Sequence, residues 1–463
     1  MNLQIFNTDG IDLKETVNEN PRKALRLMAI PGFFSLFCLS LNGLVDTIFV
    51  SNCGPESLIG VGMIQSFFVI IVGIGTGLSV AINSYLSYVI SKSESHEEAS
   101  KIIDNSIFLT AVLGILVSVI MIIILKPLLI LVNLYAPAIE PALDYGYILF
   151  GGNIFFFFAA VTPAILKAEG EIVKTTYSLT STSLLNIVLD YILIRVLGYG
   201  VTGAAIATVC CSALCCTLLI YFMAKSDNVH LNLPKILKNV DSDLIKKLLK
   251  DATPVAFESM VLSLFGILAN LMFNALNSPA DYSGFVAAYR LFLFVVIPVH
   301  AISEGNVTIT AYLFGSNQLD KMKDLFKYEI KIACGISLVL WLIIFIFRYT
   351  IALLFIGSAD IAYVDALMLA LPLINSLLII LPLGIISVSV LQGIQHYKES
   401  FAVSFIRSIL LEVLFGFLGV FLFHDALHVY IGLIVGAILG SILSFVVTGR
   451  VLSREIKDME NSV

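Results

Sequence analysis

The stretch that decides the fold is TTYSLTSTSLLNIVLDYILIRVL, residues 175–197. It is long enough to cross a bilayer as a helix, because a span needs about 20 mostly apolar residues. Asp190 lies inside this run, where a carboxylate costs at least about 2.5–3.5 kcal/mol. Asn186 precedes it by four residues, so a helix places both side chains on one face. The pair therefore predicts a polar site whose other members come from neighbouring spans.

The composition is that of an integral membrane protein. Of the 463 residues 59% are hydrophobic and 13% are charged, and the mean hydropathy is +0.98. Soluble domains of this size carry about 25% charged residues. The net charge of −6 comes from acids that lie in loops beside basic residues, so we expect no nucleic-acid partner. The first twenty residues lack the basic and apolar order of a signal peptide.

The same length rule predicts twelve spans. They lie near 24–50, 57–82, 104–131, 141–166, 175–197, 201–224, 251–277, 284–313, 328–356, 363–392, 400–423 and 429–449. With the N-terminus inside, 22 of the 27 lysines and arginines fall in inner segments and only Lys126, Arg195 and Arg348 in outer ones. This positive-inside bias places both termini in the cytoplasm.

Two similar halves make up the predicted fold. Aligning Pro31 with Pro254 without gaps gives six identities in some twenty residues. Since each half has six spans, the repeat is parallel, as in carriers that move two bundles about a central site. We predict an all-α protein with two pseudo-symmetric six-helix bundles. Its parts are a cytoplasmic N-terminus (1–23), an N-lobe (24–224), a cytoplasmic linker (225–250), a C-lobe (251–449) and a cytoplasmic tail (450–463).

The linker is predicted to include a short amphipathic helix. Asp241 is suited to cap its first turn. In the helix that follows, leucines lie on one face and lysines on the other, which is typical of a helix at a membrane surface.

Topology predicts that four polar side chains of the N-lobe lie at similar depths. Asp46 is about 8 Å from the outer end of its span, and Asp190 and Thr208 are each about 10 Å from theirs, at 1.5 Å per residue. Asn186 lies one turn deeper. Two carboxylates, an amide and a hydroxyl suit Na⁺, which takes oxygen ligands. The same pair of acids is suited equally to carry a proton. In the second half Ala269 replaces Asp46, so the site belongs to the N-lobe.

Other intramembrane polar groups are secondary candidates. Tyr145 and Asn153, near four consecutive phenylalanines, could line a cavity for a flat organic cation. Glu258 is a further candidate for that cavity or for ion coupling. Arg407 and Glu412 are expected to form an internal ion pair. Glu304 and Arg290 have no assigned partner.

No motif of a hydrolase, metalloprotease or intramembrane protease occurs, so we expect no enzyme and no cofactor beyond a coupling ion. The four cysteines Cys210, Cys211, Cys215 and Cys216 share one span and are expected to pack as small apolar residues. Metal binding by this cluster is the less favoured reading, because zinc sites require closed ligand sets.

Several segments together resemble the multidrug and toxic compound extrusion (MATE) transporters. They are IPGFFSLFCLSLNGLVDTIFV (30–50), LKAEG (166–170) and NIVLDYILIRVLGYGVTGAAIATV (186–209). The likeness is greatest to the prokaryotic DinF-like subgroup. It implies a V-shaped arrangement of two six-helix lobes and a coupling site at Asp46, Asn186, Asp190 and Thr208. It also implies a bend of the first helix at Pro31.

The function implied is secondary active antiport in the cell membrane. Small amphipathic, cationic organic compounds would leave in exchange for Na⁺ or H⁺ by alternating access. The alternative is a flippase of the same superfamily for lipids or lipid-linked saccharides, although the spans lack a basic cluster to hold pyrophosphate. Membrane lipid is the expected surrounding, and we expect a monomer because two lobes of one chain could enclose the pathway.

Overall fold

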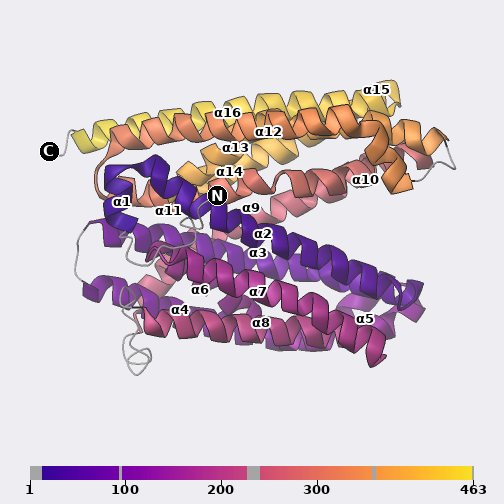
Figure 1. Ribbon diagram of the computed structural model, residues 1–463, viewed down its shortest axis with the longest axis horizontal. Helices are drawn as coiled ribbons and strands as arrows, with labels where there is room; N and C mark the ends of the chain where they lie inside the picture. Colours follow the sequence, from indigo (N-terminus) through magenta and orange to yellow (C-terminus); the bar gives the residue numbers. More distant parts are fainter. Residues whose placement is uncertain (1–12, 93–95, 227–239, 357–360, 461–463) are drawn as a thin grey trace. The chain divides into compact units, whose positions relative to one another are not determined.

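The computed structural model describes residues 13–92, 96–226, 240–356 and 361–460. Within these ranges the chain forms helices joined by short turns, and no strand occurs (Figure 1). The predicted N-terminus, linker and tail fall partly on residues 1–12, 227–239 and 461–463, which lie outside the described residues. The chain divides into two compact units.

Unit 1 comprises the described residues of Met1–Thr16 and Ile30–Ala256. It contains the start of α1 (Leu13–Glu19), most of α2 (Pro21–Ser51), and the beginning of α9 (Ser242–Asn274). Between them lie α3 (Pro55–Ser91), α4 (His96–Leu131), α5 (Ala136–Gly151), α6 (Asn153–Ala168), α7 (Ile172–Asp190), the π-helix η2 (Tyr191–Val196) and α8 (Gly200–Lys225).

Unit 2 comprises Val17–Ala29 and Phe257–Val463, and the remainder of α9 belongs to it. It continues with α10 (Pro279–Val295), α11 (Ile297–Gly315), α12 (Leu319–Ile356), α13 (Ile361–Gly393) and α14 (Tyr397–Phe405). The π-helix η4 (Ile406–Val413), α15 (Leu414–Phe423) and α16 (Ala426–Glu460) complete it.

The predicted all-α membrane fold is confirmed. Ten described helices are long and apolar enough to cross a membrane, and two bent helix pairs raise the number to twelve when each pair counts as one span. The pairs are α5 with α6, bent by 48°, and α10 with α11, bent by 41°. Large side chains such as Ile123 and Ile346 are 69% and 68% exposed. Such apolar surface suits lipid and would be unstable in water.

Proline does not break every span that contains it. Helices α2, α9 and α13 continue through Pro31, Pro254, Pro372 and Pro382. The two breaks fall instead at Gly152 and at Val296, which lies two residues before Pro298. Neighbouring helices in a membrane protein can satisfy the carbonyl that a proline frees, so a proline need not end a helix.

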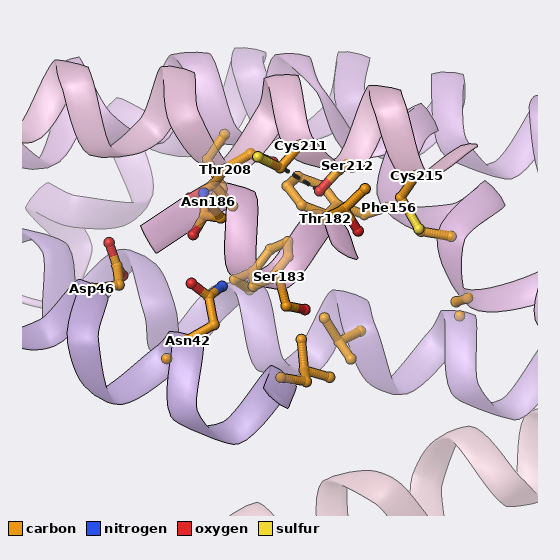
Figure 2. A pocket seen from close by; sticks show the side chains of 18 of the residues that line it. Asn42, Asp46, Phe156, Thr182, Ser183, Asn186, Thr208, Cys211, Ser212 and Cys215 are labelled. Carbon is orange, nitrogen blue, oxygen red and sulfur yellow. Dashed lines mark hydrogen bonds between the residues drawn. The ribbon is translucent and has the colours of Figure 1, made fainter. Parts of the chain in front are cut away.

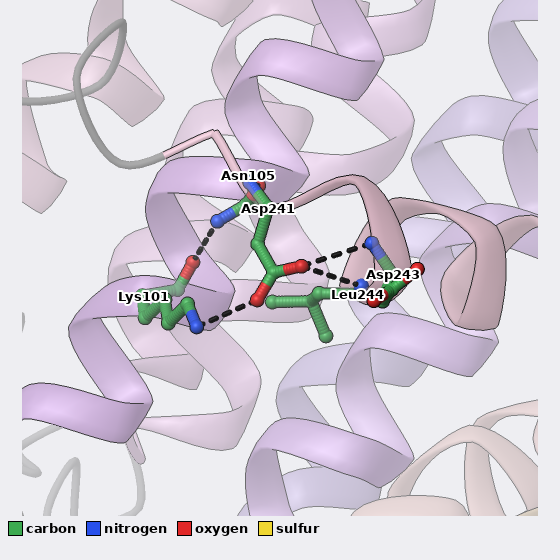
Figure 3. A network of polar contacts seen from close by, with 5 residues as sticks. All are labelled: Lys101, Asn105, Asp241, Asp243 and Leu244. Carbon is green, nitrogen blue, oxygen red and sulfur yellow. Dashed lines mark hydrogen bonds and ion pairs between the residues drawn. The ribbon is translucent and has the colours of Figure 1, made fainter.

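The cap predicted at Asp241 is confirmed, but the expected short helix is not separate from the span that follows. Asp241 Oδ1 accepts from the backbone N–H of Asp243 at 2.9 Å and of Leu244 at 3.2 Å (Figure 3). Its other oxygen lies 2.6 Å from Lys101 Nζ, which ties the start of α9 to α4. Chiefly because of the Lys101 hydrogen bond, and then the two backbone donors, the pKa of Asp241 is lowered to about 2.

Glycines let α15 and α16 approach closely. A Cβ on Gly432 would lie 2.1 Å from the carbonyl oxygen of Phe415, and one on Gly436 would lie 2.5 Å from the Cα of Glu412. Helices in membranes commonly use small residues at such interfaces, because their backbones can then approach to van der Waals contact. This contact holds η4 and α15 firmly against α16.

Candidate functional site

A cavity of about 420 Å³ lies inside unit 1, between helices α2, α3, α5, α6, α7 and α8 (Figure 2). Its polar lining comes from the first, fifth and sixth predicted spans and from two side chains of α3 and α5. Its apolar lining includes Phe68 and Phe156, whose rings pack edge to face. A small ligand site commonly has this form, an apolar hollow with a few polar groups.

Three of the four residues of the predicted coupling site line this cavity, and the fourth, Asp190, does not. Asp46 from α2, Asn186 from α7 and Thr208 from α8 line the cavity. Asp190 lies one helical turn after Asn186, is 0% exposed, and is within electrostatic range of Asp46. Three separate helices thus contribute oxygens to one region of unit 1.

Several polar atoms of this group are buried without a hydrogen-bond partner among the described residues. They are one carboxylate oxygen of Asp46, both carboxylate oxygens of Asp190, and both amide atoms of Asn186. Leaving a buried polar group unpaired costs about 1–3 kcal/mol, and more for a charged one. Thr208 donates its hydroxyl proton to the carbonyl of Ala204 at 3.0 Å, so its lone pairs are available to a cation. The arrangement can therefore hold a small positive ion or a proton.

Tyr145, predicted as a cavity residue, lines the cavity and lies within electrostatic range of Asp46 and Asp190. Gln65 Nε2 donates to the Tyr145 hydroxyl at 3.3 Å, which fixes the ring beside the acids. Gln65 and Asn42, which also line the cavity, were not predicted. Asn42 precedes Asp46 by four residues, so the rule that paired Asn186 with Asp190 identifies it as well.

Asn153 and Glu258 lie elsewhere. Asn153 is fully buried at the start of α6, and neither of its amide atoms has a partner among the described residues, but it does not line the cavity. Glu258 belongs to unit 2, where it accepts hydrogen bonds from Ser400 at 2.6 Å and from Gln392 at 3.3 Å. Protein donors therefore satisfy Glu258, in contrast to Asp190.

The ion pair predicted between Arg407 and Glu412 is confirmed. Arg407 Nε lies 3.9 Å from Glu412 Oε1, and both side chains are buried. Both residues lie in the π-helix η4. Glycines of α13 and α16 make room for the arginine, since a Cβ on Gly384 or Gly440 would collide with it.

Each half of the chain has a π-helix in its fifth span. Asp190 is the last residue of α7, and η2 begins at the next residue. In unit 2, η4 interrupts the corresponding span. Single π-turns inside helices are frequent at functional sites, because the extra residue changes the direction of nearby side chains. In unit 1 this change occurs directly beside the buried acid.

Spans of this number and length, two units, and a cavity with a buried acid in its wall are the features of a polytopic membrane carrier. The MatE family model matches residues 31–192 and 254–418, and its two matches begin at the prolines that the internal repeat aligns. The chain belongs to this family, the multidrug and toxic compound extrusion transporters, whose members carry solutes and are not enzymes.

Relatives agree with this assignment. The chain is 23% identical over 368 residues to the probable multidrug resistance protein YoeA of Bacillus subtilis, covering 77% of this chain and 78% of that protein. It is 23% identical to the multidrug export protein MepA of Staphylococcus haemolyticus over the same shares of the two chains. It is 25% identical to the probable multidrug resistance protein NorM of Thermotoga maritima, over 76% of each.

Solved structures share the fold. A crystal structure of a MATE protein in complex with MaL6 matches with a TM-score of 0.90 at 25% identity, covering 96% of this chain and 100% of that one. A MOP superfamily transporter from Pyrococcus furiosus matches with a TM-score of 0.89 at 25% identity, covering 96% and 99%. The protein is therefore a multi-pass membrane transporter of the multidrug extrusion type.

Proposed function

We propose that the protein is an antiporter that exports small amphipathic, cationic organic compounds in exchange for Na⁺ or H⁺. The coupling ion binds in unit 1 at Asp46, Asn186, Asp190 and Thr208. The observation that carries the proposal is the buried carboxylate of Asp190, which has no protein donor among the described residues and lies within electrostatic range of Asp46. The likeness to a probable multidrug resistance protein and to a multidrug export protein supports an organic cargo.

The ligand chemistry fits either ion. For Na⁺ the site offers carboxylate, amide and hydroxyl oxygens and no nitrogen cation. For H⁺ the two acids offer one shared place, because two nearby carboxylates in a low dielectric resist joint ionisation. The bound ion is exchanged cargo, and the protein needs no other cofactor.

Coupling requires the ion to bind one conformation of the carrier more tightly than the other. An ion with equal affinity for both would move no equilibrium. Binding at the unit 1 acids would favour the conformation that releases the organic compound outward. A single chain placed in the cell membrane with both termini in the cytoplasm is sufficient for this cycle.

The test is efflux of a fluorescent organic cation from proteoliposomes that contain the full chain. A sodium gradient and a proton gradient are imposed separately, for the parent, Asp46→Asn and Asp190→Asn. We expect flux that follows one gradient and disappears in both variants. Asp365→Asn, which makes the same change at an exposed acid of α13, should transport like the parent.

Two results would count against the proposal. Parent-like, gradient-driven flux in Asp46→Asn and Asp190→Asn would remove the ion site from the mechanism. Absence of flux under either gradient, together with movement of a labelled lipid between leaflets, would favour a flippase.

A further inference from the structure

Two cysteines of α8 lie on the wall of the unit 1 cavity. Cys211 and Cys215 both line it, and Figure 2 places them along the same helix at its border. Their neighbours in sequence differ, because Cys210 is exposed and Cys216 is buried without lining the cavity. All four are free thiols. The helical period thus divides the cluster into one pair that faces the cavity and two residues that do not.

The spacing of Cys211 and Cys215 allows both sulfurs to bind the same atom of a ligand. Residues four apart on a helix have Cβ atoms about 5–6 Å apart on one face. Rotation about the Cα–Cβ bonds can bring two thiols at that spacing onto one soft atom, and sulfur ligands select soft partners. No group of three or more His, Cys, Asp or Glu side chains in the described residues is placed to hold a metal ion. A ligand that fits this pair has a central atom that bonds to the two sulfurs, and its remaining bond is to a group of the ligand itself.

The surroundings of the thiols favour a neutral ligand. Thr182, Ser183, Ser212 and Phe156 line the same part of the cavity and carry no charge. No cation is among the residues that line the cavity, and Cys211 lies within electrostatic range of the Asp190 carboxyl. Forming a thiolate there would place a second negative charge near a buried acid and away from water, which is costly. A ligand that reacts with the neutral thiols and releases only neutral products avoids that cost.

We propose that Cys211 and Cys215 form a dithiol site that binds trivalent organoarsenic compounds of the type R–As(OH)₂ inside the unit 1 cavity. Two As–O bonds and two S–H bonds break, two As–S bonds form, and each thiol proton leaves with a hydroxyl as water. Arsenic remains trivalent, so no oxidant or reductant is needed. The organic group R occupies the apolar part of the cavity beside Phe156. The proposal concerns binding alone and holds whichever ion drives transport.

The experiment uses the full chain in detergent micelles with phenylarsine oxide as the probe. Intact mass is measured after washing with excess monothiol, which strips arsenic held by a single sulfur. We expect one phenylarsenic group per parent chain. Because a second attachment point commonly multiplies affinity by about 100-fold or more, Cys211→Ser and Cys215→Ser should each lower it by about that factor. Cys210→Ser and Cys216→Ser should bind like the parent.

A second measurement needs no variant and remains informative if a serine replacement fails to fold. Phenylarsine oxide should protect Cys211 and Cys215 of the parent from a maleimide, as mapped by peptide mass, and leave Cys210 reactive. Retention of arsenic by Cys211→Ser, its loss in Cys210→Ser, or maleimide labelling of Cys211 in the arsenic-treated parent would each overturn the proposal.

Discussion

Replacing Asp190 with asparagine should abolish the dependence of protein stability on the coupling ion. In the parent, three carboxylate oxygens of Asp46 and Asp190 are buried without a partner among the described residues. At about 1–3 kcal/mol each, a ligand that satisfies all three can recover about 3–9 kcal/mol. This range brackets the roughly 4 kcal/mol that corresponds to a millimolar Kd. Asparagine removes the charge that attracts the ion, so the sodium response should disappear if Na⁺ is the coupling ion. If H⁺ is the coupling ion, the variant should lose the part of the pH dependence that Asp190 contributes and keep the part that other acids such as Asp241 contribute.

The assay is thermal unfolding of the full chain in detergent at one scan rate. Sodium is varied against choline at constant pH and ionic strength, and protons are varied in a separate series. An ion that binds only the folded chain adds about 1.4 kcal/mol for each tenfold rise in concentration above Kd. For units of about 200 residues this corresponds to a shift of about 3–6 °C in the unfolding midpoint.

The reasoning fails if Asp190→Asn retains the response of the parent to the same ion. It also fails if the parent responds to neither ion over concentrations that support transport. Asp365→Asn serves as the control, because it removes an exposed acid of α13 and should keep the full parental shift.

Three further predictions concern packing and charge. Gly432→Ala forces a Cβ into a backbone carbonyl and should lower the unfolding free energy by about 1–3 kcal/mol. An added Cβ at Gly335 would meet nothing within 4 Å, so Gly335→Ala should leave the unfolding free energy unchanged or raise it by up to about 1 kcal/mol. A thermal midpoint that is lower for Gly335→Ala than for Gly432→Ala would contradict the close approach of α15 and α16. Glu412→Gln should lower the unfolding free energy by about 3–5 kcal/mol, because it leaves the buried Arg407 charge without its partner. A double-mutant cycle with Arg407→Met should show strong coupling between the two residues, and additive losses would argue against the ion pair. Because folding lowers the pKa of Asp241 from 3.8 to about 2, its stabilising contribution is present above about pH 4 and is lost as the pH falls toward 2. Protection of the two capped amides from hydrogen exchange, taken relative to the intrinsic rate at each pH, should fall over that range in the parent, whereas Asp241→Ala should show low protection throughout.

Much of the fold could be predicted because membrane insertion depends on local composition. A run such as 175–197 is recognised by its own hydrophobicity without knowledge of its neighbours. The distribution of lysine and arginine predicts the orientation of the spans, which stays a prediction. The internal repeat needed only the alignment of Pro31 with Pro254. Counting residues along the predicted spans predicts similar depths for Asp46, Asn186, Asp190 and Thr208, and this stays a prediction.

The exact ends and geometry of individual helices were harder to predict from the sequence. The pattern predicted a separate linker helix capped by Asp241, but the helix continues into the span, since no residue after the cap ends it. No pattern in residues 191–196 or 406–413 predicts a π-helix, because that geometry depends on how neighbouring helices pack.

The sequence by itself determined that the chain is helical, crosses a membrane and carries acids in its spans, because the cost of placing charge in hydrocarbon applies to each residue separately. Only the tertiary structure decided which of these acids have partners. Glu258 receives hydrogen bonds from Ser400 and Gln392, which are 142 and 134 residues distant, whereas Asp190 receives none from the described residues. Hydrogen bonds between helices depend on packing, and packing brings together residues that no local pattern relates.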